Sequence, residues 1–491
     1  MIFSPQTVYT MKQMKKALPL MLMALGSSAF LAAERQPNIV FIFTDDQGWG
    51  DLGSYGHPHI QTPHIDALAR EGMRFTQFYV ASPVCSPSRA AKITGRHAPE
   101  TGIHYAIGGP AGDQFNSVPW LDPEIPTIYD IFTYAGYVTG HYGKWHMGWR
   151  DAEGNPVAPP PSEYGVRVSG TTHSTGPRMH RRGEQVTNAN KSEIIANRAV
   201  EFIEEYKDEP FLLNLWFHDP HSILEPTRDM MELYKEHSAL WGVQEPRQEF
   251  ISSLTVYYAI ITAIDTAVGR IVEALEEAGI REDTIILYSS DNGPSPLWSR
   301  NTGHEGAGLT GPFRGTKASL YEGGIRVPLV ANWLGRFPAN VVDDQTVVSA
   351  IDMMPTLATL AGVPMVDDPE ISGLDMSRAF LGEPIPERDG PLFWEYRFGN
   401  WGRDIQKSPR LAIRDGDWKL LMNPEGDRKE LYNLARTPNE TENVALYELD
   451  VLERLENRLM NWYNEKVPDH GKAPPFAGRM HWRMPRTGDL E

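Results

Sequence analysis

The sequence is poor in cysteine, since its 491 residues include a single one, Cys85. One cysteine cannot form an internal disulfide, so stability must come from a large core or from a bound metal. Basic side chains are also few, 46 against 64 acidic ones, and the resulting net charge of −18 disfavours a nucleic-acid partner. The hydrophobic content of 41% is ordinary, which excludes a disordered chain.

Long apolar runs are lacking as well, so we expect no segment that spans a membrane, which takes about 20 residues. The apolar stretch 17–25 is too short for a span. It follows Lys12, Lys15 and Lys16 and precedes small residues, the layout of a secretory signal. We therefore predict a signal peptide at 1–33 and an exported mature chain, periplasmic or secreted, that begins near Glu34.

Buried-strand and helix patterns alternate over most of the chain. Residues 38–44 are apolar at nearly every position, which is typical of a strand buried on both faces of a parallel sheet. Further strands are predicted at 74–80, 137–141, 211–217, 284–290 and 327–333. Helices are predicted at 62–72, 127–136, 193–206, within 250–278 and at 352–361. This alternation predicts an α/β fold with a large, doubly wound, mostly parallel sheet flanked by helices.

The composition changes after about residue 383. Short antiparallel strands are predicted at 391–396, 411–414, 418–422 and 430–434, followed by a helix at 446–463. We expect a catalytic domain at 34–383, a small C-terminal α+β domain at 384–471 and an irregular strap at 472–491. Residues 151–183 are predicted to form a long loop. Its basic part, 173–182, either extends the site toward a polyanion or is a solubilising surface.

Polar side chains follow four of the predicted strands. They are Asp45 and Asp46 after the first, Lys144 and His146 after 137–141, His218 and His221 after 211–217, and Asp291 and Asn292 after 284–290. Open α/β sheets bind their ligands outside the carboxyl ends of the strands. These four segments are therefore expected to meet in one crevice.

Four of these residues, Asp45, Asp46, Asp291 and Asn292, offer only oxygen ligands, which suit Ca²⁺ or Mg²⁺ rather than Zn²⁺. Either pair alone is more typical of a turn or a helix cap. Both pairs at one end of the same sheet would repel strongly without a cation. The sequence therefore predicts a metal site.

The motif Cys85-Ser-Pro-Ser-Arg89, followed by Gly95-Arg96, resembles the signature of the type I, formylglycine-dependent sulfatases. Seven further blocks resemble that family in its order. They are 37–51, 143–148, 218–221, 290–293, 315–317 with 322–328, 414–420 and 430–434. The blocks are most similar to the arylsulfatase and N-acetylgalactosamine-6-sulfatase branch, within the alkaline phosphatase-like superfamily.

The resemblance implies that Cys85 is oxidised to formylglycine (3-oxoalanine), whose hydrate carries two hydroxyls. One would attack sulfur to form a covalent sulfo-enzyme intermediate, and the other would expel sulfate. It further implies that Asp45, Asp46, Asp291 and Asn292 hold Ca²⁺, with Mg²⁺ less favoured, and that residue 85 completes the site. An unmodified Cys85 at a helix start would instead be a nucleophile activated by the helix dipole and by the nearby arginine.

The same resemblance assigns roles to the remaining polar residues. Arg89 would hold residue 85 in place by pairing with the carboxylates or the diol. Lys144 and Lys317 would clamp the sulfate oxygens. His218 would protonate or polarise the leaving oxygen, and His146 would be the base on the second hydroxyl.

Two histidines are left open. His221 is a substrate-side candidate whose alternative is a structural histidine. His304 could face the substrate but receives no role.

We expect a sulfatase that acts on a sulfated oligo- or polysaccharide, with a formylglycine-generating enzyme as its partner during biogenesis. One alternative is a phosphodiesterase or phosphonate monoester hydrolase of the same superfamily, although Ser88 favours the sulfatase. Another is a catalytically silent binder of sulfated glycans.

Overall fold

The computed structural model describes residues 35–108, 117–148, 158–175, 178–181, 184–185, 187–239, 253–296, 304–385, 387–397 and 407–467. The predicted signal peptide and C-terminal strap lie outside these residues.

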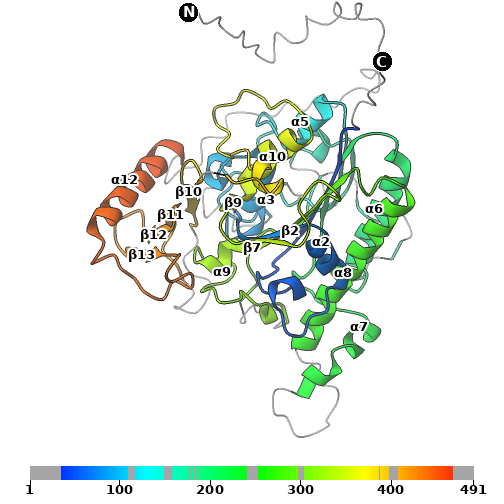
Figure 1. Ribbon diagram of the computed structural model, residues 1–491, viewed down its shortest axis with the longest axis horizontal. Coiled ribbons are helices and arrows are strands. Elements are labelled where there is room, and N and C mark those ends of the chain that lie inside the picture. The colour runs from blue at the N-terminus through cyan, green and yellow to red at the C-terminus, as the bar shows by residue number, and fades with distance from the viewer. Residues whose placement is uncertain are drawn as a thin grey trace, which may run out of the picture.

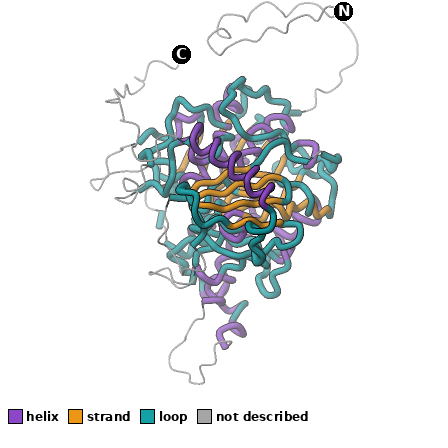
Figure 2. Tube along the Cα trace, turned by 90° about the vertical axis from the view of Figure 1, so that its left-hand side faces the viewer, coloured by secondary structure: helices purple, strands orange, loops and turns teal. Residues whose placement is uncertain are grey.

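A nine-stranded sheet runs through the middle of the molecule (Figure 2). Its strands are β1 (Asn38–Thr44), β2 (Met73–Tyr79), β3 (Val138–Lys144), β4 (Val168–Thr172), β5 (Phe211–Trp216), β6 (Thr284–Ser290), β7 (Arg326–Asn332), β8 (Val341–Asp343) and β9 (Val348–Ser349). The order is β4-β3-β5-β1-β6-β7-β2-β8, and β9 pairs with β2. All neighbours pair in parallel except β7, which is antiparallel to β6 and β2. The predicted mostly parallel sheet is confirmed.

Strand β1 lies in the middle of the sheet and is therefore buried along its whole length. It pairs with β5 on one side and with β6 on the other, in parallel. Parallel pairing also links β3 to β5, and two antiparallel steps through β7 leave β2 pointing the same way as β1. The carboxyl ends of β1, β2, β3, β5 and β6 therefore lie at one edge of the sheet.

Helices cover both faces of this sheet (Figure 1). The α-helices in the described residues are α2 (Pro63–Glu71), α3 (Cys85–Thr94), α5 (Ile128–Tyr134), α6 (Lys191–Tyr206), α7 (Arg228–Glu232), α8 (Ser253–Glu277), α9 (Glu322–Ile325), α10 (Met353–Leu360), α11 (Ser377–Phe380) and α12 (Leu449–Lys466). Of these, α12 packs on the C-terminal sheet and not on this one. Phe41 and Phe43 of β1 share a core with α3, α5 and α10. Val40 and Ile42 point to the other face and share a core with α2, α6 and α8. The alternation of side chains along β1 thus creates two cores.

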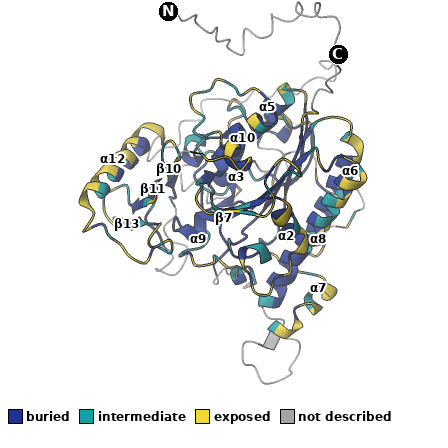
Figure 3. Cartoon of the chain, in the orientation of Figure 1, coloured by how far each residue is buried: buried dark blue, intermediate teal, exposed yellow. Residues whose placement is uncertain are grey.

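Helix α8 corrects one expectation from the sequence. It is long and apolar enough to span a membrane by length and composition, although no such segment was expected beyond the N-terminus. Most of that apolar stretch is buried inside the protein, against α2, α6 and α7 (Figure 3). A helix packed on several sides is apolar around most of its circumference, so α8 is a core helix.

The prediction of a long loop at 151–183 is wrong in part. Residues 168–172 form β4, which pairs in parallel with β3 at the edge of the sheet, and Pro161–Tyr164 form a 3-10 helix. An edge strand needs few apolar residues, and Val-Ser-Gly-Thr-Thr has β-branched residues but no apolar run by which to predict a strand. In the basic part of this segment, the guanidinium of Arg181 pairs with Glu201 of α6 at 2.8 Å.

The C-terminal region forms a second sheet, as predicted. Strands β10 (Leu392–Glu395), β11 (Leu411–Asp415), β12 (Trp418–Met422) and β13 (Glu430–Asn433) pair antiparallel in this order. Helix α12 packs on one face of the sheet, where Leu420 meets Leu455 and Leu459. Its outer side is exposed (Figure 3). These elements are called the small domain below.

Gly143 directly precedes the site residue Lys144 at the end of β3, where the backbone passes very close to Trp216. Its φ is +104°, and a Cβ there would lie 2.0 Å from the carbonyl oxygen of Trp216. Gly136 has a similar φ of +92° but open space around it.

We predict that Gly143→Ala lowers the free energy of unfolding by about 1–3 kcal/mol more than Gly136→Ala, the matched control. Denaturant titration measures both, and equal losses would contradict the close approach.

Candidate active site

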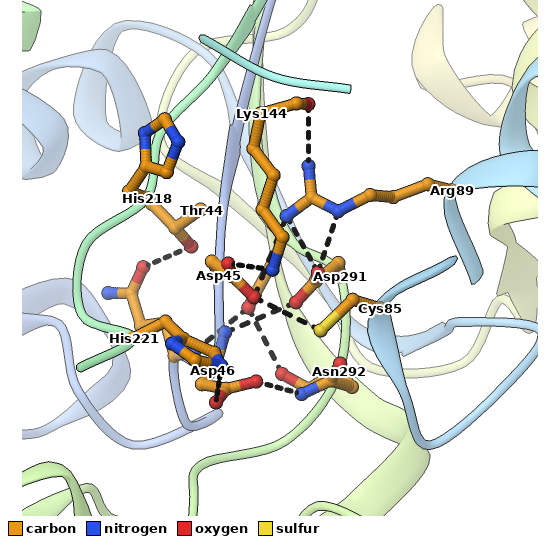
Figure 4. Close-up of polar contacts among 12 residues, drawn as sticks. Thr44, Asp45, Asp46, Cys85, Arg89, Lys144, His218, His221, Asp291 and Asn292 are labelled. Carbon is orange, nitrogen blue, oxygen red and sulfur yellow. Dashed lines mark hydrogen bonds and ion pairs between the residues drawn. The ribbon is translucent and has the colours of Figure 1, made fainter. Parts of the chain in front are cut away.

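The carboxyl edge of the sheet brings together residues that are far apart in the sequence (Figure 4). Asp45 and Asp46 directly follow β1, and Asp291 and Asn292 directly follow β6. Lys144 is the last residue of β3. Cys85, the first residue of α3, reaches the same place after β2. The parallel sheet therefore positions the metal-ligand candidates, Lys144 and Cys85 together.

Helix α3 carries two of these residues on one side. Val84 is extended and caps the helix, so Cys85 stands at its first position, and Arg89 follows one turn later. Arg89 is fully buried; its Nε and Nη2 donate hydrogen bonds to Asp291 Oδ2 at 2.9 and 2.7 Å. Its Nη2 also lies 3.7 Å from Asp45 Oδ1. The arginine thus ties the helix to carboxylates that follow two different strands.

Two lysines neutralise the remaining negative charge. The Lys144 ammonium pairs with Asp45 Oδ2, and Lys317 Nζ donates to Asp46 Oδ2 at 2.6 Å. Burial alone would lower the pKa of Lys144, but the charge of Asp45 outweighs it and raises this pKa. Burial opposes ionisation of Asp45, yet Lys144 and the other nearby cations hold its pKa below the usual value. Three carboxylates therefore balance three cations in a site that is almost closed to solvent.

The donor set fits a hard divalent cation. Asp45, Asp46 and Cys85 each place a potential ligand atom within 4.8 Å of the others. Asn292 Nδ2 donates to Asp46 Oδ1 at 2.7 Å and to the Gly293 carbonyl at 2.9 Å, which fixes the orientation of the amide. Its Oδ1 is buried and has no hydrogen-bond partner within the described part of the chain. A buried amide oxygen beside carboxylates is a ligand that Ca²⁺ accepts.

The thiol of Cys85 lies among charged groups. Its Sγ is 3.4 Å from Asp45 Oδ1 and 3.6 Å from Lys317 Nζ. Burial raises the pKa of this thiol to about 12, and the charge of Asp45 adds to the increase. The direction of this shift is opposite to the activation by helix dipole and arginine that was considered from the sequence. A protonated thiol is a poor nucleophile.

His146 and His218 lie near β4 and the residue that follows it, His173. His218 Nε2 contacts the Thr172 hydroxyl, and the His146 and His218 rings lie 5.2 and 6.0 Å from that of His173. The Nδ1 atoms of His146 and His218 are buried with no partner among the residues described. Burial lowers the pKa of both imidazoles, so both are neutral at pH 7.

The two histidines left open have different surroundings. His221 Nε2 lies 3.9 Å from Asp46 Oδ2, which places it at the mouth of the site. His304 Nδ1 is 3.2 Å from Ser253 Oγ at the start of α8. The next residue, Glu305, is buried, and its carboxylate lies within 4.8 Å of His221 and Asp46 ligand atoms.

Sequence analysis gave no role to Thr172 or Glu305, and it considered His173 only as the start of the basic segment 173–182. Thr172 and His173 belong to a segment that was predicted to be a long loop, and Glu305 follows no predicted strand. Pairing of Thr172 with His218 depends on β4 joining the sheet, which the sequence pattern did not indicate.

Comparison with known proteins agrees with this geometry. The family model described as "Sulfatase" matches residues 37–363, and the model described as "N-sulphoglucosamine sulphohydrolase, C-terminal" matches 314–466. The chain therefore belongs to the sulfatase family and is a sulfuric ester hydrolase, which confirms the resemblance in the cysteine motif.

Individual relatives cover most of the chain. It is 32% identical over 406 residues to N-acetylgalactosamine-6-sulfatase of Canis lupus familiaris, covering 77% of this chain and 72% of the relative. It is 32% identical over 423 residues to arylsulfatase A of Homo sapiens, covering 82% and 78%. Among solved structures, Ps i-CgsB in complex with k-i-k-neocarrahexaose superposes with a TM-score of 0.72 at 25% identity, covering 88% of this chain and 94% of that one.

The raised pKa of Cys85 predicts a slow thiol in unmodified protein. With a pKa of about 12, roughly one thiol in 10⁴ is ionised at pH 8. In the presence of a metal chelator, alkylation of Cys85 by iodoacetamide should therefore be slow at pH 8. The alkylation rate should increase about tenfold per pH unit up to pH 11. Peptide mass spectrometry measures the rate, with the same protein in denaturant as control. Equal rates in folded and denatured protein would contradict the assignment.

Proposed function

We propose that this sulfatase releases inorganic sulfate from a sulfated oligo- or polysaccharide after export through its N-terminal signal. The observation that carries the proposal is the cluster of Arg89, Lys144 and Lys317 around Cys85, balanced by three buried carboxylates. Carbohydrate as the substrate class is supported by the name of the canine relative and by the oligosaccharide in the complex of the similar structure. Export is supported by the signal layout of residues 1–33.

We infer that Asp45, Asp46, Asp291 and Asn292 hold Ca²⁺, with residue 85 completing the site. A set of five protein ligands, which includes the amide oxygen of Asn292, supports Ca²⁺ over Mg²⁺, because Mg²⁺ demands a nearly ideal octahedron and retains several waters. A bound Ca²⁺ would supply positive charge that polarises a sulfate oxygen and lowers the pKa of a bound hydroxyl.

Formylglycine at position 85 is the second part of the proposal. Its support is the family motif together with the high pKa of the unmodified thiol, which suits nucleophilic attack poorly. A formylglycine hydrate supplies two hydroxyls on one carbon, one to attack sulfur and one through which sulfate can be released.

The charged and histidine side chains of the site would then bind the sulfate group and transfer protons. Lys144 and Lys317 flank residue 85 and would bind the sulfate oxygens, while Arg89 keeps α3 in register with the carboxylates. With Glu305 included, four carboxylates face Arg89, Lys144 and Lys317, and a divalent cation would turn this excess of one negative charge into a net positive site for a sulfate monoester. His146 is neutral and so can accept a proton, although burial lowers its pKa and weakens it as a base, and Thr172 would orient His218 toward the leaving oxygen.

Activity on matched substrates tests the reaction. We predict that the enzyme hydrolyses an aryl sulfate with a far larger kcat/KM than the matching aryl phosphate. Cys85→Ala should lower kcat by at least about 10³-fold, because it removes the covalent route. The variant should keep the wild-type Tm within a few degrees. A preference for the phosphate ester would support the phosphodiesterase alternative and defeat the proposal.

Metal binding has its own test. Ca²⁺ at about 100 times its Kd should add about 2.7 kcal/mol to the stability of the folded protein, seen as a higher Tm. Asn292→Ala should weaken this response because it removes one oxygen ligand. Asn332→Ala is the matched control, since Asn332 is equally buried but bonds to Leu68 and Arg281. Identical Ca²⁺ responses in both variants would contradict the ligand set.

A further inference from the structure

Helix α9 lies between the small domain and the large sheet (Figure 1). It has only four residues, Glu322–Ile325, and all are buried. Its backbone makes one hydrogen bond to each of three segments that carry site residues. The bonds, donor first, are Gly323 N to Arg314 O at 2.7 Å, Gly293 N to Gly324 O at 3.0 Å and Val80 N to Ile325 O at 2.9 Å. These segments lead to Lys317, Asn292 and Cys85 respectively.

The two glycines of α9 pack closely against the backbone of neighbouring segments, which leaves little room for a shift. A Cβ on Gly293 would lie 1.9 Å from the Gly323 carbonyl oxygen, and one on Gly324 would lie 2.0 Å from the Ser319 carbonyl oxygen. Displacement of α9 must therefore move its neighbours, including the segment that carries Lys317.

Glu322 of α9 is held from two sides. Its Oε2 accepts hydrogen bonds from the Tyr79 hydroxyl of β2 at 2.5 Å and from Arg326 Nη1 at 3.3 Å. Its Oε1 faces the small domain and accepts a bond from Lys419 Nζ of β12 at 2.8 Å. One carboxylate thus joins the large sheet to the small domain.

The small domain completes this junction with a second carboxylate. Lys419 is fully buried, and its Nζ also lies 2.8 Å from Glu440 Oε1. Glu440 Oε2 accepts a hydrogen bond from the backbone N–H of Glu322 at 2.7 Å. A buried cation between two buried carboxylates has little freedom to move, because separating them would leave a charge without compensation.

We propose that Lys419 is a positioning residue for sulfate binding: it fixes Glu322 and α9, and through them the position of the Lys317 ammonium. The small domain thereby sets the affinity of the site for the sulfate group without touching the substrate. This inference rests on the proposed role of Lys317 as a sulfate ligand.

Lys419→Met in the full-length enzyme at saturating Ca²⁺ tests the proposal. The expected result is a rise of about tenfold in the KM for an aryl sulfate and in the inhibition constant of inorganic sulfate, with a smaller change in kcat. A merely structural role would lower Tm and leave both constants unchanged. Leu420→Ala is the matched control: this neighbouring residue points to the opposite face of β12, into the core under α12. It should lower Tm without changing the sulfate constant.

Lys317→Ala and the double variant Lys317→Ala/Lys419→Met complete the design. If Lys419 acts through Lys317, the double variant should bind sulfate no more weakly than Lys317→Ala alone. Glu440→Gln loses one charge of the cluster and keeps an oxygen for the Glu322 N–H, so it decides the question if Lys419→Met does not fold. It should weaken sulfate binding in the same direction and to a smaller extent.

The results distinguish a failure of the positioning proposal from a failure of the proposed function. If Lys317→Ala weakens sulfate binding while Lys419→Met and Glu440→Gln leave it within about twofold of the wild type, the positioning proposal is overturned and the function stands. If Lys317→Ala itself leaves sulfate binding unchanged, the role of Lys317 is wrong, and the positioning proposal fails with it.

Discussion

The constraint on which the structure depends is the burial of three carboxylates side by side. Asp45, Asp46 and Asp291 are each at most 1% exposed. Isolated charges in such surroundings would cost several kcal/mol each, so the fold must bring cations to them with good geometry. Arg89 comes from α3, Lys144 from the end of β3 and Lys317 from the segment before α9. Each ion pair therefore joins two separate parts of the chain, and the site can form only when the whole domain is folded.

The parallel sheet makes this meeting possible. Strand β1 lies between β5 and β6, so the residues that follow these strands arrive at the same edge although they are far apart in the sequence. Helix α3 adds Cys85 and Arg89 from the end of β2, a strand separated from β1 by β6 and β7. The two cores on either side of β1 keep these strands in register. The stability of the core and the geometry of the site are thus set by the same packing.

Sequence patterns predicted the central elements because these have strong periodic signals. The strands at 38–44 and 284–290 appear at their predicted positions, since each has a continuous apolar run at its centre, as is typical of a strand buried on both faces. The edge strand β4 has no such signal and was missed, and Thr172 was missed with it. The motif identified Lys144 and Lys317, but their pairing with Asp45 and Asp46 depends on distances of a few ångströms that no spacing in the sequence encodes. The high pKa of Cys85 is another result of burial, reinforced by the charge of Asp45, and the sequence motif does not show how deeply the thiol is buried.

The overall charge of the protein and the charge of its site have different consequences. A net charge of −18 repels a sulfated polymer at long range. At physiological salt, however, the Debye length is about 8 Å, so distant surface carboxylates are largely screened. Lys144, Lys317 and Arg89 act at contact distance and in surroundings of low polarity, where a charge interacts more strongly than at the surface. Recognition of an anionic ester by an acidic protein therefore depends on how well these three cations are buried and held, which is a property of the fold and not of the composition.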